Sequence, residues 1–299
     1  MQVSVIIPVY NAQETIENCI CSLFNQSLSS EYYEIIVVDN NSSDSTKKIL
    51  KKLPVHYVYE ANPSVYKARN TGVAISSGDI IAFLDGDCIA SKDWLAEGIK
   101  VMENYEIAAG KIYPLPSKKK YLYYYDVIVL RAYPKKVNED INICAGNFFV
   151  SRKLFEQIGG FISSIVTAGD SLLSMQAKTR GYRVGLAPKA IVYHPVDPYR
   201  IRLGRCFREG KGSILKDNYK LAKADKLEKR MLYFSKILNF IRIMKNRLML
   251  VQDAHLKKYI SRKEMIILSL FVIIFIINEY AGVLAAKYFK NLTSLLAIR

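Results

Sequence analysis

Two aspartates, Asp85 and Asp87, are the residues of this sequence whose spacing best suits chemistry. They follow the apolar run Ile80 to Leu84 and are separated by Gly86. Alternate residues of an extended chain share a face, and glycine lets the backbone turn so that both carboxylates converge. Two close carboxylates repel each other unless a cation neutralises them. A divalent cation that takes phosphate oxygens as its other ligands would do so; a solvated Asp-Gly turn is the alternative.

The elements around these aspartates indicate an α/β fold on a mostly parallel sheet flanked by helices. We expect strands at residues 3–9, 34–38, 55–59 and 79–84, and helices at residues 12–25, 43–53 and 64–76. Ligands of such sheets bind beyond the carboxyl ends of the strands. Asn11, Asp39 and Asp85 follow three of these strands, so we expect them to share one crevice. No GxGxxG motif follows the first strand, which weighs against a dinucleotide-binding site.

The pattern loosens after residue 105. A strand is expected at residues 142–150 and a helix at residues 152–158, and a further helix should begin at Gly169 and Asp170. The aromatic cluster of residues 121–125 and the lysines before it have no regular period. We expect residues 118–125 to contact the acceptor of whatever reaction the carboxylates support.

The composition of the 299 residues, 51% of them hydrophobic, suffices for one large core and an appendage. The strand-like run begins at Val3, so no secretory signal is expected at this end. Five cysteines form no CxxC pair, which favours reduced, buried thiols in the cytosol.

The net charge of +16 is concentrated in the last third of the chain. Residues 1–199 carry 21 basic and 20 acidic side chains, whereas residues 200–299 carry 22 basic and 7 acidic ones. Such a segment has an anionic partner, either nucleic acid or the anionic cytoplasmic leaflet of a membrane.

An apolar segment in the same third favours the membrane over nucleic acid. Residues 265–277 and 281–286 are nearly all apolar and have basic flanks. Residues 227–251 have the period of a basic amphipathic helix, suited to a lipid surface or to packing on the rest of the protein. Glu279 would be costly at the centre of a bilayer. A spanning helix, an in-plane helix and a buried helix of an oligomer all remain open.

Six short motifs occur in an order that resembles the family 2 inverting glycosyltransferases of GT-A fold, over about residues 3–212. The motifs are Ser4 to Asn11, Val37 to Asp39, Ala68 to Gly72, Phe83 to Asp87, Gly159 to Phe161, and the pair Gly169 and Asp170. The resemblance implies a glycosyltransferase of the hexosyltransferase type that moves a sugar from a nucleotide sugar, with UDP as the expected nucleotide. The single tryptophan, Trp94, leaves no Gln-x-x-Arg-Trp motif, which favours addition of one sugar over processive synthesis.

The resemblance also implies a role for each matching residue at the nucleotide sugar. The carboxylate of Asp39 would accept a hydrogen bond from the nucleotide base, or would cap the N-terminus of the next helix. The remaining donor-binding residues would be Pro8, Tyr10, Asn11, Lys67, Arg69, Asn70, Asp85, Arg205 and Arg208. Arg205 and Arg208 would belong to a basic loop that closes over the diphosphate, or would instead begin the membrane-facing region.

The metal and the base complete the implied site. Asp85 and Asp87 would bind Mn²⁺ or Mg²⁺, with His194 as a further ligand or as a structural residue. Asp170 would be the catalytic base. Gly169 stands where an acidic neighbour is common in this family, and Asn40 where a second aspartate is frequent.

The expected protein has three parts: a GT-A catalytic domain at residues 1–215, a basic amphipathic region at residues 216–263, and an apolar transmembrane or membrane-associated helix with a basic tail at residues 264–299. It should act at the cytoplasmic face of the cell membrane, in cell-envelope polysaccharide biosynthesis, on a glycan or polyprenol-linked acceptor. Its expected partners also include an anionic membrane surface and a second copy of the chain, but no nucleic acid. A membrane scaffold with an inactive transferase domain and a nucleotidyltransferase are the alternative functions.

Overall fold

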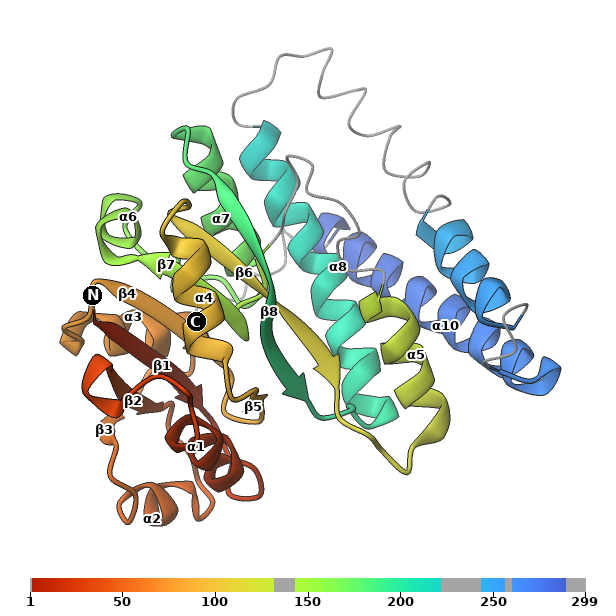
Figure 1. Cartoon of the computed structure of the whole chain (residues 1–299). Coiled ribbons are helices and arrows are strands. Elements are labelled where there is room, and N and C mark those ends of the chain that lie inside the picture. The colour runs from red at the N-terminus through yellow and green to blue at the C-terminus, as the bar shows by residue number, and fades with distance from the viewer. Residues whose placement is uncertain (1, 132–142, 222–242, 256–259, 289–299) are drawn as a thin grey trace. The chain divides into compact units, whose positions relative to one another are not determined.

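A computed structural model describes residues 2–131, 143–221, 243–255 and 260–288 (Figure 1). The chain divides into two compact units. The first comprises residues 1–115 and 134–195, and the second comprises residues 116–133 and 196–299.

One eight-stranded sheet forms the framework of the first unit, in the order β3-β2-β1-β4-β7-β6-β8-β5. The parallel strands of its first half are β3 (His56–Tyr59), β2 (Tyr33–Asp39), β1 (Val3–Val9) and β4 (Ile80–Leu84). The second half consists of β7 (Asn147–Ser151), β6 (Ile107–Pro114), β8 (Val184–His194) and β5 (Ile89–Ala90). In that half only β6 and β8 pair in parallel. This mixed, mostly parallel sheet confirms the predicted α/β fold.

The helices of the first unit lie between these strands in the chain: α1 (Ile16–Phe24), α2 (Thr46–Leu50), α3 (Val65–Ile75), α4 (Trp94–Met102), α6 (Arg152–Gln157) and α7 (Gly169–Thr179), with a 3₁₀ turn η1 (Ser30–Tyr32). Serine caps fix two of their starts, because the Ser64 hydroxyl accepts from the Lys67 amide and the Ser151 hydroxyl from the Leu154 amide. α2 is shorter than predicted. The Asp44 carboxylate accepts from the Thr46 amide and holds the preceding residues in a turn.

The two faces of the sheet bury separate apolar clusters. In β1, Val5 and Ile7 pack into the cluster that includes α1, whereas Ile6 packs with Phe83 and Phe148 on the opposite face. Because both faces are covered, the strands are apolar at nearly every position, as is usual for parallel strands. The strands that end at Asp39 and Asp85 therefore form a rigid support for the side chains that follow them.

Strands β6 and β8 were not predicted. Their buried positions are largely alanines, which carry little strand propensity and give no alternating pattern of bulky side chains. The pairing of β6 with β8 shifts register between Gly110 and Lys111. Near this shift the side-chain Nδ2 of Asn147 donates to the carbonyls of Lys111 (2.8 Å) and Ala190 (3.0 Å), one on each strand. The order of this half of the sheet depends on a buried polar side chain, which periodicity does not reveal.

The second unit is helical in the residues described. It contains α5 (Lys120–Arg131), α8 (Tyr199–Leu221), a helical stretch at residues 243–255, and α10 (Arg262–Tyr288). Its apolar cluster includes Leu122, Cys206, Val251, Val272 and Phe275. The predicted aromatic cluster forms part of α5. Part of the predicted amphipathic helix, residues 227–242, and the basic tail from residue 289 lie outside the described residues.

α10 confirms the predicted long apolar helix. Its segment Arg262–Ala285 is long and apolar enough to cross a membrane by length and composition. The charge that the sequence places in it, Glu279, has a partner within the same unit: its Oε2 lies 3.5 Å from Nη1 of Arg247.

Candidate active site

Asp85, at the end of β4, is held by a buried arginine of α3. Its Oδ1 accepts from Nη2 of Arg69 at 2.6 Å, and Arg69 is only 3% exposed. The guanidinium Nε of Arg69 is buried and has no hydrogen-bond partner among the described residues. Such a fixed, charge-assisted bond orients the carboxylate. Contact between Arg69 and a donor substrate stays a prediction.

Asp170 lies in the first turn of α7 and is anchored by backbone amides. Its Oδ2 accepts from the Ala145 amide at 3.2 Å, and its Oδ1 from the Ser171 amide at 2.8 Å. Gly146, the residue after Ala145, lies so close to Asp85 that a β-carbon on Gly146 would be 2.7 Å from Oδ2 of Asp85. Two consecutive residues thus bring together the carboxylates of Asp85 and Asp170, which are 85 positions apart in the sequence.

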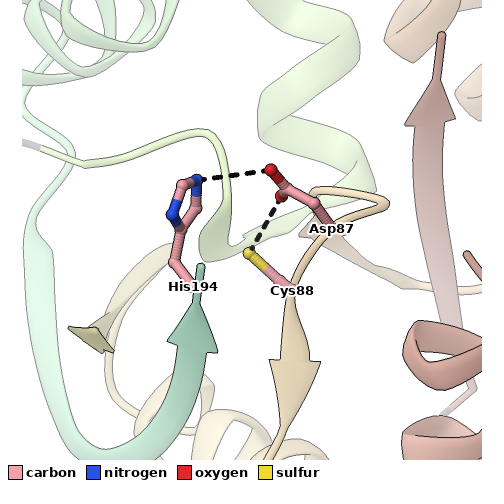
Figure 2. A group of neighbouring side chains, drawn as sticks. All are labelled: Asp87, Cys88 and His194. Carbon is pink, nitrogen blue, oxygen red and sulfur yellow. Dashed lines mark hydrogen bonds and ion pairs between the residues drawn. The ribbon is translucent and has the colours of Figure 1, made fainter. Parts of the chain in front are cut away.

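Asp87 and His194 approach each other across the strand ends, as Figure 2 shows. Nε2 of His194 lies 3.6 Å from Oδ2 of Asp87, and Nδ1 of His194 lies 2.6 Å from the carbonyl oxygen of Pro195. A proton on Nδ1 would bond that carbonyl and leave the Nε2 lone pair directed at Asp87, the usual arrangement of a metal-ligating histidine. The Sγ of Cys88 lies 3.7 Å from Oδ1 of Asp87.

The donor atoms of Asp87, Cys88 and His194 lie within 4.8 Å of one another, so these residues could hold a cation. Burial and the nearby aspartates raise the pKa of the Cys88 thiol well above its ordinary value. Without a cation the thiol therefore stays protonated, and sulfur is a soft ligand that suits Mn²⁺ or Mg²⁺ less well than oxygen does. A carboxylate oxygen and an imidazole nitrogen suit Mn²⁺. The residues present fit a divalent cation at Asp87 and His194, and Asp85 lies two positions before Asp87 and is bonded to Arg69.

Asp39, fully buried at the end of β2, is held on both carboxylate oxygens. Oδ1 accepts from the Ser42 amide (2.9 Å) and Oδ2 from the Tyr57 hydroxyl (3.0 Å). Burial and the bond to Asp39 raise the pKa of Tyr57 to about 12, so its hydroxyl remains a donor. Asp39 thus organises the loop after β2 rather than capping α2, whose N-cap is Ser45. Each oxygen keeps a lone pair for a further donor.

The other predicted donor-binding residues of the first unit lie nearby in sequence. Pro8 is buried within β1 and Tyr10 is exposed after it. Asn11 adopts a φ of 49° and its Oδ1 accepts from the Ser43 amide at 2.8 Å. These contacts tie the loop after β1 to the loop after β2.

Lys67 and Asn70 lie on α3. The Asn70 side chain pairs with the Phe161 backbone in both directions, because Nδ2 donates to the carbonyl (2.8 Å) and Oδ1 accepts from the amide (3.0 Å). This pairing fastens the loop before α7 to α3. Lys67 is half-buried.

Arg205 and Arg208 belong to α8 of the second unit. Nε of Arg205 lies 3.2 Å from Oδ2 of Asp197, whereas Arg208 is exposed. The prediction that they close over a diphosphate stays a prediction.

Tyr66 is a site residue that sequence reasoning missed. Its hydroxyl accepts from the Gly169 amide at 2.8 Å, and its ring centroid lies 5.7 Å from Cζ of Arg69. The signal was its position three residues before Arg69, which puts both on one face of α3.

Comparison with known proteins yields one family and several relatives. The model of the family "Glycosyl transferase family 2" matches residues 4–159. Glycosyltransferase AglE of Haloferax volcanii is 33% identical over 221 residues, which cover 71% of this chain and 73% of AglE.

Solved structures show the same fold. The mannosyltransferase PcManGT from Pyrobaculum calidifontis, in complex with GDP-Man and Mn²⁺, is 19% identical, with a TM-score of 0.64 over 96% of this chain and 87% of that one. S. aureus TarS 1–349 in complex with UDP-GlcNAc is 16% identical, with a TM-score of 0.55 over 96% of this chain and 92% of that one.

Proposed function

The chain belongs to glycosyl transferase family 2 and is a glycosyltransferase, and from this premise we propose that it moves one sugar, with inversion, from a nucleotide sugar to an acceptor hydroxyl. The observation that carries the proposal is the convergence of Asp85 and Asp170 on the neighbouring residues Ala145 and Gly146. This convergence brings Asp85, which would bind the donor, close to Asp170, which would act on the acceptor hydroxyl. The chemistry lies within residues 1–215, the proposed catalytic domain.

Asp170 is the proposed base. An acceptor oxygen forms a bond to the anomeric carbon as the bond from that carbon to the diphosphate breaks, and the bonding pair leaves with the nucleoside diphosphate. The acceptor proton passes to Asp170, as in general base catalysis. The two backbone amides that bind Asp170 fix its direction and leave a lone pair on each oxygen for this proton.

Mn²⁺ or Mg²⁺ is the proposed cofactor, held by Asp87 and His194 together with Asp85. When bound, the cation neutralises charge on the departing diphosphate. The Pro195 carbonyl supports this assignment because it fixes the His194 ring with Nε2 toward Asp87.

A UDP-sugar is the proposed donor. The buried Asp39 carboxylate suits the N–H edge of uracil, and Ser42 and Tyr57 hold it in place. The TarS structure contains UDP-GlcNAc, whereas the PcManGT structure contains GDP-Man. These two relatives define the alternatives that a test must separate. Pro8, Tyr10, Asn11, Lys67, Arg69 and Asn70 complete the proposed donor site of the first unit, and contact of Arg205 and Arg208 with the diphosphate stays a prediction.

The proposed acceptor is a lipid-linked or cell-envelope glycan at the cytoplasmic face of a membrane. One face of α10 supports this location. Its large apolar side chains are between 39% and 57% exposed and recur every three, four or seven residues: Ile266, Leu270, Ile274, Ile277 and Leu284. At 1.5 Å per residue this apolar stripe is about 27 Å long. Such a continuous apolar surface indicates an interaction site.

An anionic lipid surface is the proposed partner of the apolar stripe. Residues 200–299 carry a net charge of +15, and the exposed Arg262 lies one turn before Ile266 on the same face. The opposite face of α10 packs Val272 and Phe275 into the apolar cluster of the second unit. α8, which is rich in arginine, also packs against α10. Because a charged neighbour is costly in hydrocarbon, we propose that α10 lies in the membrane plane rather than across it.

The test is a donor panel of UDP-glucose, UDP-GlcNAc and GDP-mannose with the full-length protein, a polyprenyl-phosphate-linked glycan and Mn²⁺. We expect nucleotide release and product only with a UDP-sugar, a product of inverted anomeric configuration, and loss of both in excess chelator. Transfer with retained configuration, or full transfer in chelator, would overturn the mechanism. Transfer from GDP-mannose alone would overturn the uracil assignment.

A further inference from the structure

Gly169 is not required by its own backbone. Of the described glycines, only Gly159, Gly160 and Gly181 have positive φ values, so the backbone of Gly169 would accept any residue. What excludes a side chain is a neighbour: a β-carbon at position 169 would lie 2.5 Å from Cε1 and 2.6 Å from Cζ of Tyr66. The ring of Tyr66 therefore fills the space that a side chain at position 169 would need.

Tyr66 is itself firmly held. It is buried, and its ring packs against Phe161 with the centroids 5.4 Å apart. Burial and the nearby Asp170 raise its pKa to about 12, so the hydroxyl stays protonated in the working range and is not the base. The hydroxyl oxygen accepts from the Gly169 amide at 2.8 Å.

The start of α7 needs such an anchor. Ala168, the N-cap of α7, adopts φ 66° and ψ 12°, a left-handed conformation that is unfavourable for alanine. The N-cap contributes no side-chain hydrogen bond. The bond from the Gly169 amide to Tyr66 therefore fixes the turn in which Asp170 sits, at a place where the backbone would otherwise relax.

We propose that Tyr66 is the positioning residue of Asp170 and that Tyr66 and Gly169 act as a matched pair, in which the ring fills the space beside Gly169 and the hydroxyl orients the turn that carries the base. This inference rests on the proposed role of Asp170. The same face of α3 carries Arg69, which holds Asp85. One rigid helix face thus sets the separation between the two carboxylates that must act on one sugar.

The first test replaces Tyr66 by phenylalanine, which removes the bond to Gly169 and keeps the ring. We expect kcat to fall about tenfold because a small misplacement of a catalytic group is costly, while KM for the donor changes less than twofold. Tyr33→Phe is the matched control: Tyr33 is also buried, and its hydroxyl donates to the Leu23 carbonyl at 2.7 Å. It should lower the melting temperature similarly and leave kcat unchanged.

Wild-type kcat in Tyr66→Phe, or the same fall in kcat in Tyr33→Phe, would overturn the positioning role. So would a loss carried by KM alone, which would assign Tyr66 to donor binding.

The second test is a cycle between positions 66 and 169, read by both turnover and thermal unfolding. Gly169→Ala should reduce kcat about a hundredfold in the wild-type background, because the new methyl group displaces the ring and with it Asp170. In Tyr66→Ala the same substitution should cost less than threefold, since the space is then open. Equal costs in both backgrounds would overturn the matched pair.

The readouts also separate this inference from the proposed function. If Asp170→Asn kept wild-type turnover, the base assignment would fail, yet coupling of positions 66 and 169 in thermal unfolding would still confirm the steric pair. If Asp170→Asn were inactive and that coupling absent, the base would stand and the pair would fail.

Discussion

Two pairs of aspartates, one in each unit of this protein, have opposite environments. In the first unit, the side chains of Asp85 and Asp87 are 35% and 40% exposed, although Arg69, which is bonded to Asp85, is buried. In the second unit, Asp126 and Asp197 are buried and lie against Arg202 and Arg205. The exposed aspartates of the first unit can be reached by a ligand. The negative charges of the buried aspartates in the second unit are instead neutralised by arginines of the protein.

This difference separates charges that support chemistry from charges that support packing. Burial raises the pKa of Asp126 even though Arg202 is bonded to it, so desolvation outweighs the attraction of the arginine. Such a pair adds little net stability while intact, and breaking it is expensive. We therefore expect substitutions at the exposed aspartates of the first unit to change rates, and substitutions at the buried ion pairs of the second to change stability.

The largest expected effect is that of Asp170→Asn. Asparagine keeps the shape but cannot take the acceptor proton, so kcat should fall by about 10² to 10⁴. Donor affinity, measured by calorimetry with a UDP-sugar and Mn²⁺, should change less than threefold. A variant with lost donor binding and unchanged kcat would reverse the roles assigned to the acceptor and donor sides.

The second effect, on stability, is that of Arg202→Met. It leaves Asp126 buried without its partner, which costs about 3 kcal/mol in the free energy of unfolding. Urea unfolding measures this cost, with Arg200→Met, at an exposed position of the same helix, as the control. Turnover per folded molecule should be unchanged. An equal loss in the two variants would mean that the buried pair has no special role.

The cost of Arg202→Met should also depend on pH. The pKa of Asp126 is raised in the folded protein, so the folded state binds this proton more tightly than the unfolded state does. The unfavourable contribution of Asp126 to the free energy of unfolding is therefore absent below about pH 4, the ordinary pKa range of a carboxyl group. It grows as the pH rises toward the pKa of Asp126 in the folded state. Loss of Arg202 raises that pKa further. The deficit should be small near pH 4 and large near pH 7; a deficit that does not vary with pH would contradict this.

The first half of the sheet could be predicted because it obeys simple rules. Its strands β1, β2 and β4 are buried on both faces, so Val3–Val9 and Ile80–Leu84 appear as apolar runs, and the parallel topology then places Asp39 and Asp85 at one edge. In the second half only β7 was predicted, where a strand was expected at residues 142–150. The strands β5, β6 and β8 were not, because β5 has two residues and small residues such as Ala108 replace the apolar pattern in β6 and β8.

Several contacts of the candidate site were beyond the reach of the sequence for a related reason. The bond from Ala145 to Asp170 and the contact of Tyr66 with Gly169 join residues 25 and 103 positions apart. No local pattern encodes such pairs. Gly169 beside Asp170 was visible in the sequence as a departure from the family pattern. Only the structure shows that the ring of Tyr66 fills the space that a side chain at position 169 would need.

A smaller effect is expected at the proposed cation site of the first unit. His194→Gln keeps a polar side chain and removes the nitrogen directed at Asp87, so the Mn²⁺ concentration for half-maximal turnover should rise about 10- to 100-fold. His56→Gln, an exposed histidine on β3, is the control. Unchanged metal dependence in His194→Gln would leave His194 a structural residue.

The smallest expected effect concerns the apolar stripe of α10 in the second unit. Leu270→Asn with Ile274→Asn should weaken binding to vesicles that contain phosphatidylglycerol by about tenfold, since each substitution removes a partly buried side chain from the lipid boundary. Val166→Asn, on an exposed residue of the first unit, is the control and should have no effect. Unchanged vesicle binding with a switch from dimer to monomer in sedimentation would assign the stripe to a second copy of the chain. Wild-type protein that alkaline carbonate cannot extract, together with unchanged binding of the variant, would instead indicate a spanning helix. Release of the wild type by carbonate with weaker binding of the double variant is the outcome expected for a helix lying in the membrane plane, because only there does one face carry the attachment.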